Sequence, residues 1–168
     1  VKRHAAEMPI EVAGRVWVIP EDDIDTDMIF HNRHLAITEQ SEMGAHAFGN
    51  LKGYEHFAAE AAPGDIVLAG KNFGSGSSRQ QAVDCFKALG VAAVIARSFG
   101  SIYERNAINS AFPIVVCDHI FDHGLKTGNK IRINFEKGVV TLPSGNVEIE
   151  VTPFPEIQME IYRNNGLF

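Results

Sequence analysis

The spacing of hydrophobic residues predicts alternating strands and helices through the middle of the chain. Short apolar runs at residues 65–69, 91–96 and 112–117 predict buried strands. Apolar residues three and four apart (82, 83, 86 and 89) predict a helix after the first strand, with a serine as its N-cap and Gly90 as its stop. A second helix is expected around residues 102–110. This order of elements is typical of a parallel sheet with flanking helices.

The two ends of the chain follow other patterns. Residues 10–19 are rich in β-branched side chains and stop at Pro20, which predicts a strand. Residues 130–135 alternate strictly, and residues 139–142 and 147–151 follow them as antiparallel candidates. A last helix over 155–165 is expected to carry Ile157, Ile161 and Tyr162 on one side.

The remaining segments are harder to interpret. Residues 21–27 are expected to form an acidic loop, and residues 32–62 short helices and loops. Together the patterns predict an α/β fold with a central, partly parallel sheet, flanking helices and a small antiparallel section. A length of 168 residues fits one domain over residues 1–168, in which residues 1–7 receive no structural weight and Met8 is an alternative start.

Composition and charge exclude several classes of function. With 15 Lys and Arg against 21 Asp and Glu, the formal charge is −6, so binding to nucleic acid or an anionic membrane is not expected. No apolar run approaches the length of a membrane span. Cys85 and Cys117 are too few for a disulfide framework and are expected to be buried thiols of a cytoplasmic protein.

The segment with the strongest chemical signal is the Gly/Ser-rich stretch before the first predicted helix. Gly74 and Gly76 let the backbone approach a ligand, and the helix N-terminus adds N–H donors. Ser77, Ser78 and Arg79 supply hydroxyls and a two-pronged cation, so an anion site is predicted. The stretch lacks the third glycine of a dinucleotide loop, the terminal Gly-Lys of a phosphate loop and the glycines of a hydrolase elbow. A plain helix-capping turn is the alternative.

Two other clusters of polar residues lack the pattern of a metal site. The acidic run at residues 21–27 lacks the glycine and glutamate that a calcium-binding loop requires, so Asp22 and Asp23 are interpreted as a solvated turn. His119 and His123 lie four residues apart, yet a metalloprotease motif needs Glu where Ile120 stands. No metal site is predicted for this chain.

Four stretches, in order, resemble those of one enzyme family. They are residues 14–17 with 24–27, residues 32–35, residues 72–79 and residues 96–99 with 105–109. Their sequence is similar to that of the aconitase swivelling domain, and the whole chain resembles the separate small subunits of 3-isopropylmalate dehydratases and homoaconitases.

The resemblance implies a hydro-lyase that removes water from a small hydroxy-acid and adds it back at the neighbouring carbon. It implies that Ser77 is the base, that Ser78 and Arg79 bind a substrate carboxylate, and that Asp27 is an acidic active-site residue. A large subunit would hold a 4Fe–4S cluster through three cysteines. With two cysteines, this chain is expected to bind no cofactor itself and to depend on that partner.

The substrate is narrowed by the residues after Leu35. Ala36 and Ile37 stand near the place where homoaconitase-type subunits carry an arginine, and an apolar pair suits an alkyl substituent better than a charge. We therefore expect isopropylmalate and a role in leucine biosynthesis. Arg33 keeps a tricarboxylate such as homoaconitate open, and citramalate or dimethylmalate would fit as well. A non-catalytic anion-binding regulatory module and a scaffold protein are the alternatives from other classes.

Overall fold

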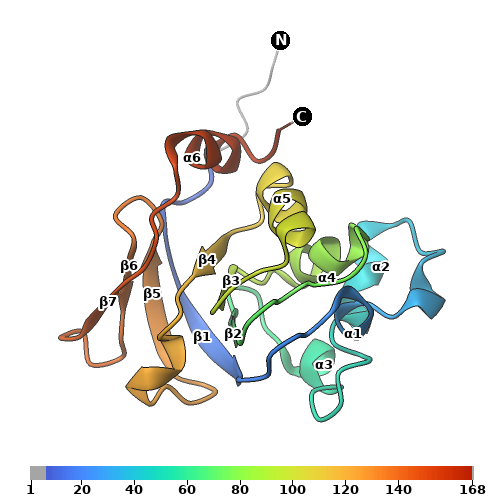
Figure 1. Ribbon diagram of the computed structural model, residues 1–168, viewed down its shortest axis with the longest axis horizontal. Coiled ribbons are helices and arrows are strands. Elements are labelled where there is room, and N and C mark those ends of the chain that lie inside the picture. Colours follow the sequence, from blue (N-terminus) through green and yellow to red (C-terminus); the bar gives the residue numbers. More distant parts are fainter. Residues whose placement is uncertain (1–6, 168) are drawn as a thin grey trace.

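A computed structural model of the chain describes residues 7–167, which form one seven-stranded mixed sheet with helices around it (Figure 1). The strand order is β4-β3-β2-β1-β5-β6-β7. The strands are β1 (Glu11–Ile19), β2 (Ile66–Ala69), β3 (Ala93–Ala96), β4 (Ile114–Val116), β5 (Lys130–Asn134), β6 (Val139–Thr141) and β7 (Glu148–Glu150).

Strand β1 joins a parallel and an antiparallel half of this sheet. Its second part pairs in parallel with β2, with Val16 opposite Ile66, and β3 and β4 continue the parallel half. Its first part pairs with β5 in the antiparallel sense, with Glu11 opposite Asn134, and β6 and β7 follow. The predicted fold class and all seven predicted strands are confirmed, and the antiparallel section is larger than expected because β1 contributes to it.

Each face of the sheet has its own hydrophobic core, because successive residues of a strand point to opposite faces. In β2, Val67 and Ala69 face one core, and Ile66 and Leu68 face the other. The first, which we call the α4–α5 core, lies under helices α4 (Gln81–Leu89) and α5 (Ser101–Asn109). The second, the α6 core, is covered by α6 (Glu156–Arg163), which lies at one end of the molecule in Figure 1.

Three local expectations were wrong. Helix α4 begins at Gln81, and its N-cap is Gln80 without a side-chain capping bond, so no serine caps it. In α6 it is Met159 and Tyr162 that are buried, whereas Ile157 is 73% exposed. The acidic segment is not wholly a loop, because Asp25 caps a short helix, α1 (Thr26–Ile29), by accepting a hydrogen bond from the Met28 N–H group.

The segment between α1 and β2 consists of short helices and turns, as expected. They are η1 (Asn32–His34), α2 (Gln40–Met43), η2 (Gly44–His46) and α3 (Phe57–Glu60). A further short helix, η3 (Ile120–His123), follows β4. None of the helices in residues 7–167 is long and apolar enough to cross a membrane.

Candidate active site

The Gly/Ser-rich stretch, residues 72–79, leaves the carboxyl end of β2 and leads into α4; we call it the anion loop. In an open α/β sheet this end of the strands is the usual place for a ligand. Gly74 adopts a φ of +79°, and a Cβ atom there would lie 2.2 Å from Cγ of the Tyr103 ring. Both the left-handed backbone and the aromatic ring behind it therefore require glycine at this position.

Segment 22–26 fastens the anion loop by a series of hydrogen bonds. Asp22 Oδ1 accepts from the Lys71 N–H group at 2.7 Å, and Asp23 Oδ1 accepts from Asn72 Nδ2 at 2.9 Å. The Gly74 N–H group donates to Ile24 O, and the Thr26 N–H group donates to Ser75 O. Asp22 and Asp23 are exposed, as predicted, but they also anchor the loop, which the solvated-turn interpretation missed.

Ser77 is exposed at the tip of this loop and makes its contacts with Thr26. The two hydroxyl oxygens, Ser77 Oγ and Thr26 Oγ1, lie 3.2 Å apart, and the Ser77 N–H group donates to Thr26 Oγ1, also at 3.2 Å. Thr26 is 2% exposed. The Ser77 hydroxyl, which the sequence predicts to be reactive, is thus in hydrogen-bond contact with the buried Thr26 hydroxyl.

Arg79 and Asp27 form an ion pair beside Ser77. Arg79 Nη1 donates to Asp27 Oδ1 at 3.1 Å and to the Phe30 carbonyl at 2.8 Å, and 14% of the Arg79 side chain is exposed. The Asn32 N–H group and the Arg79 guanidinium hold the pKa of the Asp27 carboxyl below its usual value, so Asp27 is a carboxylate at neutral pH. Asn50 Nδ2 also donates to this carboxylate, a contact that no sequence pattern indicates.

One nitrogen of the Arg79 guanidinium has no hydrogen-bond partner. Within residues 7–167, Arg79 Nε is the buried side-chain polar atom that lacks a hydrogen-bond partner. Because Nη1 already serves Asp27 and Phe30, Nε and Nη2 are the pair of donors left for a carboxylate. A buried donor without an acceptor is costly, and a bound carboxylate would remove that cost.

Four backbone donors stand where the anion loop enters α4. The N–H groups of residues 78–81 donate to no carbonyl of the described chain, and they precede the first turn of α4. Asn106, on α5, donates to the Ser78 carbonyl at 3.1 Å and so fixes the loop from the other side. Gln80 Nε2 contacts Asp84 and Ser110, and Gln81 Nε2 contacts the Leu35 carbonyl at 3.4 Å. The arrangement offers an anion several convergent donors.

The hydrogen bond from Gln81 to the Leu35 carbonyl brings the predicted substrate-binding segment, residues 33–37, near the start of α4. Arg33 is exposed and its Nε donates to His34 Nε2 at 3.2 Å. His34 stacks on His46 with ring centroids 3.7 Å apart, and burial and neighbouring cations lower the His34 pKa. Ala36 is exposed, whereas Ile37 is partly buried against the α4–α5 core, so much of its surface serves packing.

The cysteines do not fit a metal cluster. Cys85 and Cys117 are free and buried, and burial raises the pKa of both thiols, which opposes the thiolate that metal ligation needs. In the described part of the chain, no group of three or more His, Cys, Asp or Glu residues is placed to hold a metal ion. His119 and His123 are exposed, and His119 Nδ1 lies 3.0 Å from Asp122 Oδ2.

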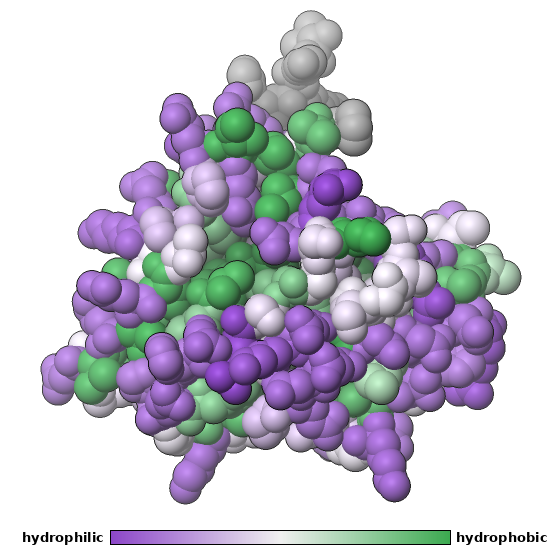
Figure 2. Space-filling model, viewed as in Figure 1, coloured by the Kyte–Doolittle hydropathy of each residue, from purple (hydrophilic) through white to green (hydrophobic). Residues whose placement is uncertain are grey.

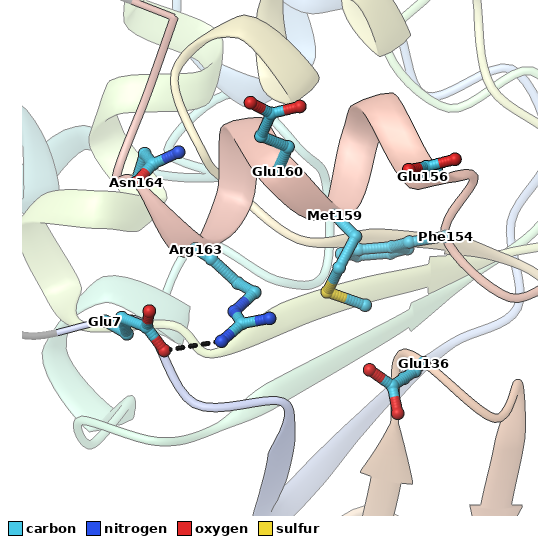
Figure 3. Close-up of a pocket in the computed structure, with 8 residues that line it drawn as sticks. All are labelled: Glu7, Glu136, Phe154, Glu156, Met159, Glu160, Arg163 and Asn164. Atoms are coloured by element: carbon cyan, nitrogen blue, oxygen red, sulfur yellow. Dashed lines mark hydrogen bonds and ion pairs between the residues drawn. The ribbon is translucent and has the colours of Figure 1, made fainter.

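A cavity elsewhere in the molecule has the wrong charge for an acidic substrate. This cavity of about 650 Å³ lies beside α6, where Arg163 pairs with Glu7 (Figure 3). Its other charged lining residues are Glu136, Glu156 and Glu160. Four carboxylates against one guanidinium repel an organic acid, so the anion loop is the better candidate.

The anion loop lies open at the surface. Gly76, Ser77 and Ser78 are exposed, and the face shown in Figure 2 carries a pale area of intermediate hydropathy to the right of centre, where Figure 1 places the start of α4. A small substrate bound here would keep one side in water. The tip of the anion loop is therefore accessible to a small ligand from solvent.

Comparison with known proteins identifies this class of domain. Residues 24–117 match the family model of the aconitase C-terminal domain, and this match includes segment 24–37 and the anion loop. The chain belongs to the aconitase C-terminal domain family, in its branch of 3-isopropylmalate dehydratase small subunits.

The similar proteins that place it in this branch match most of the chain. The 3-isopropylmalate dehydratase small subunit of Halothermothrix orenii is 40% identical over 146 residues, which is 87% of each chain. Small subunit 1 of Archaeoglobus fulgidus is 40% identical over 92% of each chain. A crystal structure of 3-isopropylmalate dehydratase from Methanocaldococcus jannaschii has a TM-score of 0.85 at 34% identity, and the match covers 94% of this chain and 90% of that one.

Proposed function

We propose that this chain is the small subunit of a hydro-lyase that converts 2-isopropylmalate into 3-isopropylmalate by dehydration and rehydration, a step of leucine biosynthesis. The observation that carries the proposal is that one loop holds both an exposed hydroxyl, that of Ser77, and an arginine, Arg79, whose Nε has no hydrogen-bond partner. The 3-isopropylmalate dehydratase relatives supply the reaction. The proposal treats the chain as one swivelling domain of a cytoplasmic enzyme.

In this proposal Ser77 is the base and Arg79 the carboxylate anchor. A serine alkoxide would take the proton from the carbon beside the one that loses its hydroxyl, and the resulting Ser77 hydroxyl would return that proton when water adds back. Alkoxides form at neutral pH only among oriented donors, and Thr26 is the donor in contact with Ser77 Oγ. The N–H groups of residues 78–81, which donate to no carbonyl of the described chain, would add to it. Ser78 and Arg79 would hold one substrate carboxylate.

Asp27 has a positioning role in this scheme. Its carboxylate accepts from Arg79 Nη1, Asn32 and Asn50, so it fixes the guanidinium with the Nε edge free. The direction of its pKa favours a carboxylate, which accepts hydrogen bonds rather than supplying a proton. Gly74 and Gly76 shape the loop that carries the serine.

The other half of the active site is assigned to a large subunit. The anion loop carries a base and an anion anchor, but the reaction also needs a group that takes the departing hydroxyl. Cys85 and Cys117 are buried, so neither is placed to bind a metal that would do this. We assign that chemistry to a 4Fe–4S cluster bound by the large subunit. Closure of the two chains over the substrate would also exclude water from the Ser77 side of the site.

The substrate side chain is assigned from segment 33–37. Exposed Ala36 offers an apolar surface near the start of α4, and the exposed edge of Ile37 would add to it. An isopropyl group fits such a surface better than a third carboxylate does. Arg33 is exposed with its Nε on His34, so its remaining donors are the feature that would favour homoaconitate.

The proposal is tested by mixing this chain with its cluster-loaded large subunit under anaerobic conditions and following absorbance of the unsaturated acid from 3-isopropylmalate. Neither chain alone should give a signal. Ser77→Ala should lower kcat of the mixture by about 10²–10⁴-fold, and Ser41→Ala, an exposed serine on α2, should leave it unchanged. Full activity of Ser77→Ala would exclude Ser77 as the base.

The same assay separates the substrates. Turnover of homocitrate, citramalate or dimethylmalate without turnover of isopropylmalate would retain the reaction and overturn the assignment of Ala36 and Ile37. Silence with all four acids, together with tight binding of a dicarboxylate by the isolated chain, would favour the anion-binding module.

A further inference from the structure

Thr26 is one of two buried polar residues in the described chain, and the only one of the two that contacts the candidate site. The other, Asp65, accepts hydrogen bonds from Arg15, Trp17 and Ala62 at the start of β2. The Thr26 hydroxyl has a different kind of partner, because both of its contacts go to Ser77. A buried hydroxyl needs hydrogen-bond partners, and this one finds them in the reactive serine.

The position of this hydroxyl is fixed from three directions. The Thr26 N–H group donates to Ser75 O at 2.9 Å, and the Thr26 carbonyl accepts from the Phe30 N–H group at 2.9 Å. Gly76 lies against the hydroxyl, since a Cβ atom on Gly76 would be 3.2 Å from Thr26 Oγ1. The Thr26 backbone is therefore fixed between α1 and the anion loop, and its hydroxyl lies against that loop.

Counting donors and acceptors assigns a direction to the contact between the two hydroxyls. Thr26 Oγ1 already accepts from the Ser77 N–H group, and its own proton has Ser77 Oγ as its acceptor among residues 7–167. If Ser77 were the donor instead, the Thr26 proton would be buried without an acceptor, which is unfavourable. Ser77 is exposed, so its own proton can point to solvent or substrate.

We propose that Thr26 is a positioning residue that donates a hydrogen bond to Ser77 Oγ and stabilises the alkoxide form of that serine. The inference rests on the proposed function, in which Ser77 is the base. When Ser77 loses its proton, the hydrogen bond becomes charge-assisted, and such bonds are shorter and stronger than neutral ones. The 3.2 Å separation leaves room for this shortening.

A variant that lacks the hydroxyl should make Ser77 harder to deprotonate. A hydrogen bond to the charged form of a group favours that form, so its loss raises the pKa of the serine. In Thr26→Val a methyl group replaces the hydroxyl at nearly the same volume. The kcat of the assembled enzyme should fall on the order of 100-fold, and the rising limb of its pH profile should move to higher pH.

The experiment compares Thr26→Val, Thr26→Ser and Thr152→Val in the complex with the large subunit, with kcat and KM measured across the pH range. Thr26→Ser keeps the hydroxyl and should stay within about threefold of wild type. Thr152 is exposed, and its hydroxyl bonds to no described residue, so Thr152→Val is the matched control. KM should change little in Thr26→Val, because Arg79 is unaltered.

The outcomes distinguish failure of this inference from failure of the proposed function. Equal losses in Thr26→Val and Thr26→Ser, or a loss without a shift of the pH profile, would make Thr26 a packing residue and overturn the inference. A Thr26→Val enzyme with wild-type kcat would overturn it as well. The proposed function itself would fail on a different result, namely full activity of the Ser77→Ala enzyme.

Discussion

The two hydrophobic cores of this protein differ in the side chains that fill them. Eight buried residues of the α4–α5 core are aromatic, against three of the α6 core. Phe30, Phe48, Phe57 and Phe73 lie outside the seven strands, and pairs such as Phe48–Phe57 and Phe73–Tyr103 have ring centroids 4.9 and 5.4 Å apart. The α6 core instead takes Ile, Leu and Val residues mainly from paired strands.

This difference follows from the backbone. Strands β5, β6 and β7 are already fixed by ladder hydrogen bonds, so modest side chains complete their packing. The segments around the anion loop have few such bonds, and large rings with specific edge-to-face geometry hold them in place. The comparison teaches that the candidate site depends on steric fit beneath it, and that the rest of the sheet should tolerate change better.

The largest expected effect on stability comes from adding a methyl group at Gly74, next to the α4–α5 core. Gly74→Ala combines a left-handed φ of +79° with a Cβ atom 2.2 Å from the Tyr103 ring, and should lower the free energy of unfolding by about 2–5 kcal/mol. Gly128→Ala, with φ of +99° and no atom within 4 Å of the new Cβ, should cost about 1 kcal/mol. Urea unfolding followed by Trp17 fluorescence measures both, and equal costs would contradict the comparison.

The next effect lies in the scaffold. Asp65→Asn leaves Arg15, Trp17 and the Ala62 N–H group without the carboxylate that accepts from all three. The free energy of unfolding should fall by about 2–3 kcal/mol, while kcat of the assembled enzyme below its unfolding transition stays near wild type. Asp122→Asn, on the exposed surface, is the control. A large loss of kcat in folded Asp65→Asn would show that scaffold and site are coupled.

A smaller effect is expected from Arg79→Lys. Lysine keeps the charge but cannot present the Nε and Nη2 donors together, so KM should rise by about 10–100-fold with a smaller change in kcat. Arg132→Lys, a surface residue paired with Glu11, should leave both constants unchanged. An unaltered KM in Arg79→Lys would remove the carboxylate anchor from the proposed site.

The smallest effect is the pH dependence of the Asp27–Arg79 pair. The Asp27 pKa is lower in the folded protein than its unfolded value of about 3.9, so the pair stabilises the fold above that pH and loses this contribution as the pH falls through the folded pKa. Since 40% of the Asp27 side chain is exposed, Asp27→Asn should cost less than about 1 kcal/mol at pH 7. Urea unfolding measured at falling pH should show the difference between wild type and Asp27→Asn shrink once the pH drops below the unfolded pKa.

The sequence predicted the parts of the fold that depend on local pattern. Alternation and short apolar runs located the seven strands, because every second residue of a strand points to the same face of the sheet. The helices α4, α5 and α6 were predicted from their spacing as well, but the N-cap of α4 and the buried side of α6 were not. Those two details depend on how each helix sits against its neighbours.

The site shows the same division. Glycine and serine content and the family resemblance singled out Gly74, Gly76, Ser77, Ser78 and Arg79, since these residues are consecutive or nearly so. Asn50 reaches the same place from a distant segment, and nothing in its local sequence marks it. Asn106 lies in a stretch that the resemblance singled out, but only the fold shows that it donates to the Ser78 carbonyl. Asp22 and Asp23 had a plausible local interpretation as a solvated turn, which hid their contacts with the loop.

The sequence by itself thus determined the order of strands and helices, the family, and the loop on which the chemistry is proposed to take place. Tertiary structure alone decided that Arg79 Nε is buried without a hydrogen-bond partner and that the Thr26 hydroxyl contacts Ser77. The physical reason is that these facts concern single atoms brought together across some fifty residues by packing on a shared sheet. Local periodicity describes which face a residue takes, and only the folded chain determines which atom it meets there.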